Sequence, residues 1–169
     1  MNQETKRISD LTMAGLIAAL YVLLTFLANL FGLASGAVQL RLSEALTIMP
    51  LVTWAAVPGL FVGCVLANFL TGCALWDVVF GSLATLAGAL GTYYIGRKHP
   101  VMAPVFPIIA NCLVVPLVLQ YVYGSADSYW FLVGTVGLGE ILSCGVLGGL
   151  LYKVLKKRKL FHEIAGQEK

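Results

Sequence analysis

Long apolar runs dominate this chain, and short polar or basic segments separate them. Continuous apolar runs occupy residues 11–31, 75–95, 101–123 and 129–155. Each is long enough to cross a bilayer as a helix, which takes about 20 residues. A transmembrane barrel would instead show alternating segments of about ten residues. The pattern therefore predicts an all-α integral membrane protein.

Residues 43–72 fit either one long helix or two short ones. Pro58 and Gly59 favour two, because proline suits the first turn of a new helix and not a helix interior. With two crossings here and a cytoplasmic N-terminus, every lysine and arginine except Arg41 falls on the inner side, as the positive-inside tendency requires. One crossing would put the basic connector at 96–100 and the basic tail outside. We therefore predict a six-transmembrane-helix bundle with both termini cytoplasmic, whose second and third helices are short.

The predicted organisation is one membrane domain with polar ends. Residues 1–10 form a cytoplasmic N-terminal segment, residues 11–155 the six-helix domain, and residues 156–169 a basic cytoplasmic tail. A signal peptide is the alternative for the first run, but that run exceeds the usual apolar core of about 7–15 residues. Asp10 stands directly before the run, where a residue that caps a helix N-terminus is expected.

Composition supports the membrane assignment and excludes several functions. The chain of 169 residues is 59% hydrophobic and 11% charged, whereas soluble domains carry about 25% charged residues. The basic residues lie in short groups beside the apolar runs, so nucleic-acid binding is not predicted. The cysteines have neither the close spacing nor the histidine neighbours of a metal or redox motif. We expect Cys64, Cys73, Cys112 and Cys144 to be small packing residues.

Motifs for catalysis are absent from the sequence. The chain has no phosphate-binding Gly-x-x-x-x-Gly-Lys-Ser/Thr loop, no His-Glu-x-x-His pair and no Gly-x-Ser-x-Gly turn. It therefore cannot hydrolyse nucleotide by itself, and no catalytic residue, cofactor or metal site is predicted. We expect a membrane protein that is not an enzyme.

Polar side chains within or beside the apolar runs are the candidates for ligand binding. Glu140 lies about eleven residues into the last run, which is near the middle of the membrane at about 1.5 Å per residue. A carboxyl at that depth marks a functional site, although a protonated glutamic acid bonded to a neighbouring helix is the alternative. Asn68 and Asn111 lie within the third and fifth predicted helices.

Three more candidates lie at the outer boundary, each with a structural alternative. Arg41 and Glu44 are three residues apart, so they also suit an ion pair at a helix start. Asp77 suits a helix cap as well as a binding group. Trp76 belongs to an outer group of aromatic residues, which fits a membrane-interface belt or stacking on a planar ligand.

Small residues at four-residue spacing mark one face of the first helix. Ala14 pairs with Ala18, and Gly15 pairs with Ala19. Such faces let helices approach closely within a membrane. Docking of another membrane subunit and packing within the bundle are equally good explanations.

Several segments together resemble the queuosine-precursor transporter (QueT) family, over nearly the whole length from residue 11 to residue 155. The motifs that carry the resemblance are residues 39–47 (QLRLSEALT), 58–64 (PGLFVGC), 67–68 (AN), 77–86 (DVVFGSLATL) and 137–140 (GLGE), with Asn111 in the proline-rich fifth run. Membership implies the substrate-binding (S) component of an energy-coupling-factor (ECF) transporter in the bacterial plasma membrane. Such components are six-helix bundles that bind their substrate from outside.

The resemblance also implies partners and a ligand. The partners are an ECF transmembrane coupling subunit, which meets Ala14 and Ala18, and two ATPase subunits. Toppling of the loaded bundle in the bilayer then delivers the substrate. The implied ligands are queuine or other 7-deazaguanines such as preQ1 and preQ0.

The chemistry of a deazaguanine suits the polar residues, but their individual roles stay open. One carboxylate can accept the two parallel N–H donors of a guanine-like edge. Glu140 or Asp77 would take that edge. The other of the two, or Glu44, would meet a cationic amine, and Asn68, Asn111 and Arg41 would donate to the ring oxygen. A self-sufficient proton-coupled carrier that uses Glu140 is the alternative function.

Overall fold

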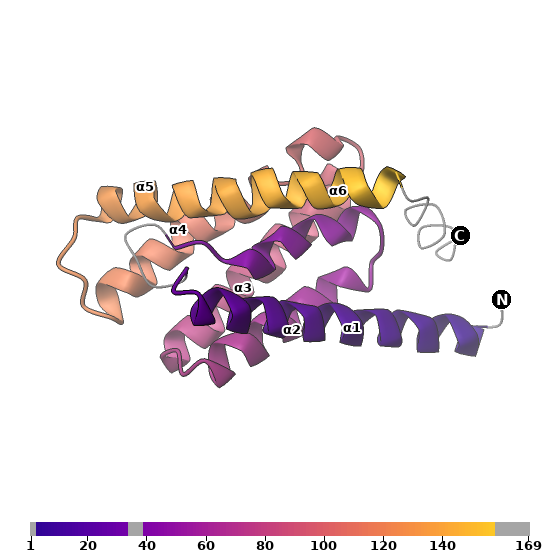
Figure 1. Ribbon diagram of the computed structural model, residues 1–169, viewed down its shortest axis with the longest axis horizontal. Coiled ribbons are helices and arrows are strands. Elements are labelled where there is room, and N and C mark those ends of the chain that lie inside the picture. Colours follow the sequence, from indigo (N-terminus) through magenta and orange to yellow (C-terminus); the bar gives the residue numbers. More distant parts are fainter. Residues whose placement is uncertain (1–2, 34–38, 158–169) are drawn as a thin grey trace.

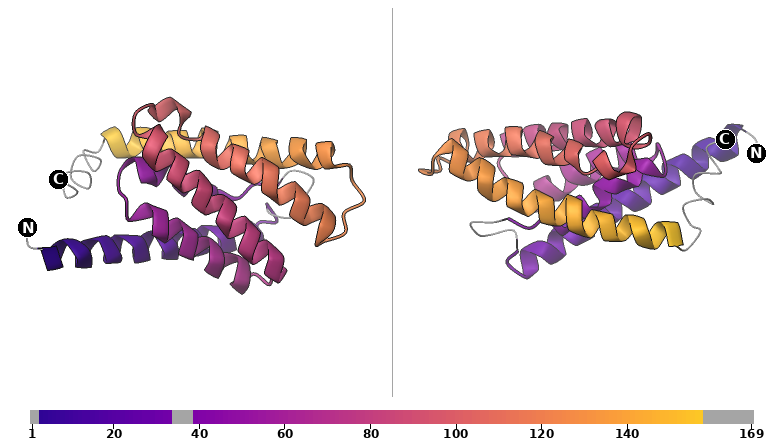
Figure 2. Two further views of the ribbon diagram at one scale, coloured as in Figure 1. Left: turned by 180° about the vertical axis from the view of Figure 1, so that it is seen from behind. Right: turned by 90° about the horizontal axis from the view of Figure 1, so that it is seen from above.

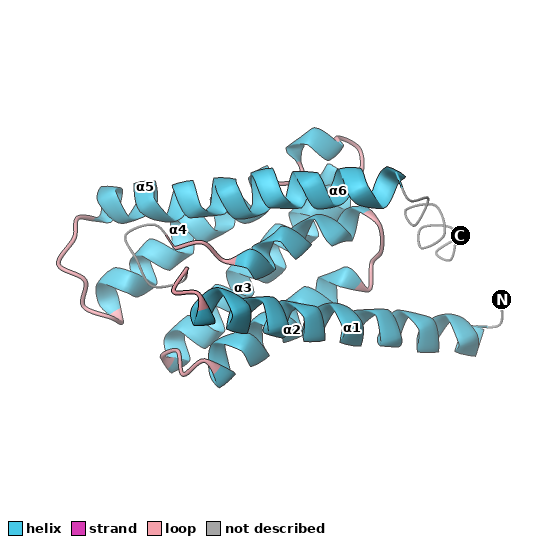
Figure 3. Ribbon diagram, viewed as in Figure 1, coloured by secondary structure: helices cyan, strands magenta, loops and turns pink. Residues whose placement is uncertain are grey.

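The computed structural model describes residues 3–33 and 39–157, and this part of the chain is helical apart from turns, without a β-strand (Figure 3). Four stretches are long and apolar enough to cross a membrane. They correspond to the four long apolar runs. They are α1 (Gln3–Leu30), α3 (Leu75–Gly91) with the π-helical turn η2 (Thr92–Gly96), the 3-10 turn η3 (Pro100–Met102) with α4 (Val105–Tyr121), and α5 (Tyr129–Glu140) with the π-helical η4 (Ile141–Leu147) and α6 (Gly148–Lys157).

The ambiguous region forms two short helices, as predicted. The 3-10 helix η1 spans Leu42–Leu51, and α2 spans Ala56–Leu70, with Pro58 in its first turn. At about 1.5 Å per residue in an α-helix and 2.0 Å in a 3-10 helix, both are roughly 20 Å long, less than a hydrocarbon core of about 30 Å. The structure therefore gives four long spans and two short helices, and six crossings remain a prediction.

The short helix η1 lies at the centre of the bundle. In Figure 1, α1 runs along one side, the α5–η4–α6 rod runs along the other, and η1 lies between them. Its contacts are with α1, α6 and η4 above all, and most of its side chains are buried. α2 packs against α1 and α3, and α4 packs against α3 and α5. η1 is therefore surrounded by elements from both halves of the chain.

The chain enters and leaves the bundle on the same side. α1 begins and α6 ends at the same end of the molecule in all three views (Figures 1 and 2). An even number of crossings produces this arrangement.

Close helix contacts are made through glycine. A Cβ added to Gly59 of α2 would lie 2.7 Å from the carbonyl oxygen of Ala14, and one added to Gly63 would lie 3.0 Å from Cα of Ala18. A Cβ on Gly88 of α3 would lie 2.6 Å from Cα of Pro107 on α4. The backbones of neighbouring helices thus approach each other closely at these glycines, as small residues permit in membrane proteins.

The capping prediction for Asp10 is wrong, and of the two alternatives for Asp77 the helix cap is not observed. α1 begins at Gln3 and continues through Asp10, so Asp10 lies inside the helix rather than before it. α3 is preceded by Ala74, and no side chain caps it. Asp77 is instead the third residue of α3, with a buried side chain. The side-chain contacts of Asp77 therefore serve something other than helix initiation.

Candidate ligand-binding site

A cavity of about 320 Å³ lies among α1, the segment before η1, α2, α3 and α4. Its volume falls in the range of about 300–1,000 Å³ that small-molecule sites occupy. Val115, Val118 and Leu119 supply apolar wall from α4. The polar lining comes from Thr25, Asn29, Gln39, Arg41, Asn68, Thr71, Asp77 and Tyr123. An apolar pocket with a few convergent polar groups is the usual form of a ligand site.

Asp77 presents a free carboxylate oxygen at this cavity. The side chain is 5% exposed, and its Oδ2 accepts a hydrogen bond of 3.0 Å from the hydroxyl of Tyr123. That hydroxyl also accepts from the backbone N–H of Ala74, so Tyr123 joins the segment after α4 to the start of α3. Oδ1 of Asp77 has no hydrogen-bond partner within the described residues. A buried acceptor without a partner is costly unless a ligand or water completes it.

Asn68 and Asp77 face each other across Gly81. A Cβ added to Gly81 would lie 3.2 Å from Oδ1 of Asp77 and 3.3 Å from Nδ2 of Asn68. The amide of Asn68 makes one weak contact, a donation over 3.6 Å to the sulfur of Cys64. An amide from α2 and a carboxylate from α3 thus lie together at the cavity.

Arg41 brings a positive charge to the same cavity. Its backbone is extended (φ −96°, ψ 99°) directly before η1, and its side chain lines the cavity. The structural alternative, an ion pair between Arg41 and Glu44, is not found among the described residues, where Glu44 accepts a hydrogen bond from Tyr21. The guanidinium of Arg41 is therefore available to a ligand.

Glu44, Asn111 and Glu140 meet in a separate buried cluster that does not line the cavity. Asn111 on α4 donates from Nδ2 to Oε1 of Glu140 over 3.0 Å. The thiol of Cys144 donates to Oε2 of Glu140 over 3.1 Å, and Tyr21 donates to Oε1 of Glu44. Glu44 is fully buried and Glu140 is 6% exposed. Glu140 therefore faces protein and not lipid. It also has a hydrogen-bond partner on a neighbouring helix, Asn111, as the alternative of a structural glutamic acid requires.

Trp76 is not brought to the cavity. Its side chain is 59% exposed and stacks on Phe80, one turn further along α3, with ring centroids 5.8 Å apart. The structure therefore divides the predicted residues into a cavity set (Arg41, Asn68 and Asp77), a buried set (Glu44, Asn111 and Glu140) and an exposed residue, Trp76.

The cavity lining residues Thr25, Asn29 and Gln39 were not among the predicted site residues. Three residues that donate hydrogen bonds to the acidic side chains were not predicted either. Tyr123 belongs to the same outer group of aromatic residues as Trp76, but its hydroxyl donates a hydrogen bond to Asp77. Cys144 was assigned to packing, although its spacing of four residues from Glu140 puts both on one helix face. Tyr21 had no signal in the sequence beyond being a hydroxyl within an apolar run.

The helical bundle and its cavity define a class of protein. Four helices suited to crossing a bilayer, together with a polar cavity among the helices, describe a multi-pass protein of the cell membrane with a cavity of small-molecule size. The chain belongs to the QueT transporter family, which its sequence matches over residues 11–157. It is therefore a membrane transport protein and not an enzyme.

One curated relative extends this comparison. The chain is 27% identical over 161 residues to a protein of Lactococcus lactis subsp. cremoris (strain MG1363) named "Queuosine precursor transporter QueT". The similarity covers 88% of this chain and 93% of that protein. No solved structure matches the chain.

Proposed function

We propose that this chain is the substrate-binding subunit for uptake of a queuosine precursor, queuine or another 7-deazaguanine, which binds in the cavity from the extracellular side. Family membership and the name of the Lactococcus relative support the substrate class. The observation that carries the proposal is the buried, unpartnered Oδ1 of Asp77 in a cavity that also holds Arg41 and Asn68.

Asp77 takes the guanine-like edge in this proposal. Among the described residues its Oδ1 has no hydrogen-bond partner and its Oδ2 accepts from the Tyr123 hydroxyl alone, so the carboxylate can accept the ring N–H and the exocyclic amine together. Arg41 and Asn68 donate to the ring oxygen. Glu140 is the weaker candidate for the edge, because both of its oxygens already accept hydrogen bonds and it lies outside the cavity lining.

We further propose six membrane crossings with both termini in the cytoplasm. α1 begins and α6 ends at one end of the bundle, which supports an even number of crossings (Figure 1). The basic residues Arg97, Lys98, Lys156 and Lys157 then lie inside, in agreement with the positive-inside tendency. η1 and α2 are each too short to cross a full hydrocarbon core. In this topology η1 runs from the outer side to the inner side, and α2 returns to the outer side.

An ECF motor drives transport in this proposal, because the chain has no nucleotide-binding loop of its own. The coupling subunit docks at a groove of about 610 Å³ between α1 and α2, which Ala14, Gly15, Ala18 and Val62 line. Ala14 and Ala18 pack partly against α2, whereas Gly15 is exposed and a Cβ there would meet nothing within 4 Å. The open part of the face is therefore the Gly15 side. Toppling of the loaded bundle then carries the cavity to the cytoplasm.

Ligand-dependent stability of the chain in detergent tests the binding site. A ligand at about a thousandfold its Kd stabilises the folded state by roughly 4 kcal/mol, so a panel of 7-deazaguanines, guanine and unrelated vitamins separates binders from non-binders. Asp77→Asn is expected to abolish the stabilisation by deazaguanines. Asp127→Asn, at an exposed loop aspartate, is the matched control and should retain it. No stabilisation by any 7-deazaguanine, or full stabilisation of Asp77→Asn, contradicts the proposal.

A proton-coupled carrier that works without a motor is the second candidate. The observation that favours it is the pair of buried carboxyls, Glu44 and Glu140, within the bundle. The test measures uptake of a radiolabelled deazaguanine into liposomes that contain only this chain. Uptake that is driven by a pH gradient and is lost in Glu140→Gln would establish the carrier. Uptake that requires the coupling subunit and ATPases excludes it.

A further inference from the structure

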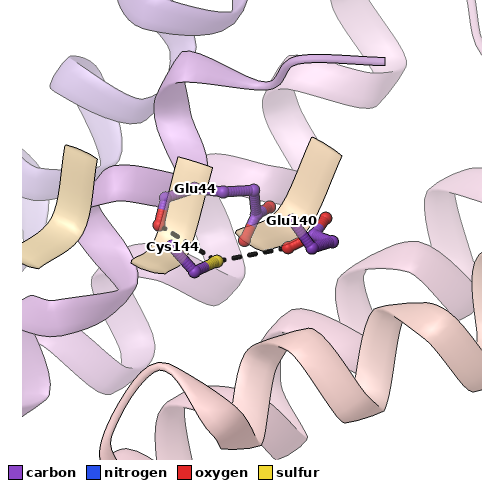
Figure 4. A group of neighbouring side chains, drawn as sticks. All are labelled: Glu44, Glu140 and Cys144. Carbon is purple, nitrogen blue, oxygen red and sulfur yellow. Dashed lines mark hydrogen bonds between the residues drawn. The ribbon is translucent and has the colours of Figure 1, made fainter. Parts of the chain in front are cut away.

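Two buried carboxyls and a thiol converge at the centre of the bundle. Glu44 comes from η1, and Glu140 and Cys144 come from one face of the α5–η4 helix, four residues apart (Figure 4). One potential ligand atom from each of the three lies within 4.8 Å of the other two. Ligand atoms around one tetrahedral zinc ion are about 3.5 Å apart, so small side-chain movements would bring these three onto one ion.

One carboxylate oxygen of this cluster is buried without a partner. Oε2 of Glu44 has no hydrogen-bond partner in the part of the chain that the structure describes, although the residue has no exposed surface. Figure 4 shows its carboxyl group directed at Glu140. Two carboxylates side by side in a low-dielectric interior repel each other unless a cation or a proton lies between them.

A divalent ion would offset most of the negative charge of its ligands. Two carboxylates and a Cys144 thiolate carry three negative charges, and the ion carries two positive ones. On binding, the ion displaces the thiol proton, which is released to solvent.

The donor set selects the kind of ion. Mg²⁺ and Ca²⁺ take oxygen ligands, whereas a thiolate with carboxylates suits Zn²⁺ and related divalent transition metals. Tyr21 and Asn111 each donate a hydrogen bond to one of the two glutamates, as partners that orient metal ligands commonly do. Three protein ligands leave a fourth position for water.

We propose that Glu44, Glu140 and Cys144 form an intramembrane site for a divalent transition metal of the Zn²⁺ type. This site lies apart from the proposed deazaguanine cavity, of which none of the three residues forms the lining. The ion would fix η1 against the α5–η4 helix, since it joins one ligand of the former to two of the latter.

Cobalt binding tests the proposal with a readout independent of transport. The full chain in detergent is stripped with a chelator and titrated with Co²⁺, and in parallel with Zn²⁺ while thermal stability is followed. We expect one ion per chain, a thiolate-to-cobalt charge-transfer band in the near ultraviolet, and a higher unfolding temperature with Zn²⁺. Cys144→Ser should lose the band and weaken Zn²⁺ binding by more than about tenfold, the effect that even outer partners of a metal have.

Controls separate this site from other thiols and from the proposed function. Cys112→Ser, at a half-buried thiol of α4 outside the cluster, should keep the band, and Glu44→Gln should lose it. The proposal is overturned if the unsubstituted chain shows no saturable band, or if the band survives Cys144→Ser. A proton shared between the two glutamates then remains as the explanation of their proximity. Stabilisation by deazaguanines, measured on the same preparations, reports on the cavity, so failure of either proposal is visible without the other.

Discussion

Asn111 on α4 donates a hydrogen bond to Glu140 at the end of α5, with 3.0 Å between Nδ2 and Oε1 and both side chains buried. This bond joins two helices that also approach closely at Gly137, where an added Cβ would lie 3.3 Å from the sulfur of Cys112. Glu140 lies where the regular α5 gives way to the π-helical η4. π-helical turns are frequent at functional sites, and here the turn coincides with the buried polar cluster.

Removal of the Asn111 amide should destabilise the bundle. Asn111→Ala leaves Oε1 of Glu140 buried without its donor, which costs about 1–3 kcal/mol in free energy of unfolding. The measurement is equilibrium unfolding in detergent micelles. Gln120→Ala is the control, because Gln120 is an amide of the same helix that hydrogen-bonds to no described residue. Equal effects of the two substitutions would show that the Asn111–Glu140 bond is not stabilising.

Gly88→Ala should be destabilising where α3 crosses α4. The added methyl group would lie 2.6 Å from Cα of Pro107 and 3.0 Å from its nitrogen, and the backbone of α4 cannot yield as a flexible side chain does. Overpacking of this kind costs about 1–3 kcal/mol. Gly134→Ala on α5 meets nothing within 4 Å and should be neutral or stabilising by about 0.5–1 kcal/mol. Thermal unfolding of both variants checks the difference, and a neutral Gly88→Ala contradicts the close contact.

The Tyr123–Asp77 contact should appear as an alkaline transition. Burial, and secondarily the Asp77 carboxylate, raise the pKa of Tyr123 to about 12, from about 10 in the unfolded chain. The folded state therefore holds this proton more tightly. The resulting stability is complete below about pH 10 and is lost as the pH rises towards 12.

Matched variants isolate that transition. The difference in unfolding temperature between the unsubstituted chain and Tyr123→Phe should be constant below about pH 10 and shrink between pH 10 and 12. Tyr121→Phe, at a side chain that is 81% exposed, should show no such change. A constant difference for Tyr123→Phe across the whole window would mean that the hydroxyl bond contributes nothing to the pH dependence.

The apolar pattern predicted the long helices closely, because crossing a bilayer imposes a length. The run at 75–95 became Leu75–Gly96, and that at 129–155 became Tyr129–Lys157. The start of α1 was misplaced. The pattern marks where the apolar residues begin, and the helix extends further, through polar residues to Gln3.

Helix geometry explains why Trp76 was grouped wrongly with the pocket residues. Successive residues of an α-helix point about 100° apart, so when Asp77 faces the cavity its neighbour Trp76 faces outward. The 3-10 winding of η1 was not predicted either. Its sequence has no local signal for that form, and tight burial between α1 and η4 accompanies it.

The division of the polar residues into cavity and cluster depends on long-range contacts. Cys144 lies 100 residues from Glu44 along the chain, yet its sulfur is 3.6 Å from the Glu44 carbonyl oxygen. A single sequence orders such residues by depth in the membrane but not by direction around each helix. The chemistry of a deazaguanine grouped Glu140 with Asp77, whereas the directions of their side chains separate them.

The exposed part of the α1 face gives the sharpest test of the motor proposal. Gly15→Leu adds a bulky side chain where a Cβ meets nothing within 4 Å, so the isolated chain should keep its stability and its ligand-dependent stabilisation. Association with a coupling subunit requires close approach of helices, so co-purification of the ECF module and ATP-dependent uptake should be lost. Gly134→Leu, at an exposed glycine of α5 with the same free space, should retain both. If uptake by Gly15→Leu equals that of the unsubstituted chain, the coupling subunit does not dock on this face of α1, and the groove between α1 and α2 is occupied by lipid alone.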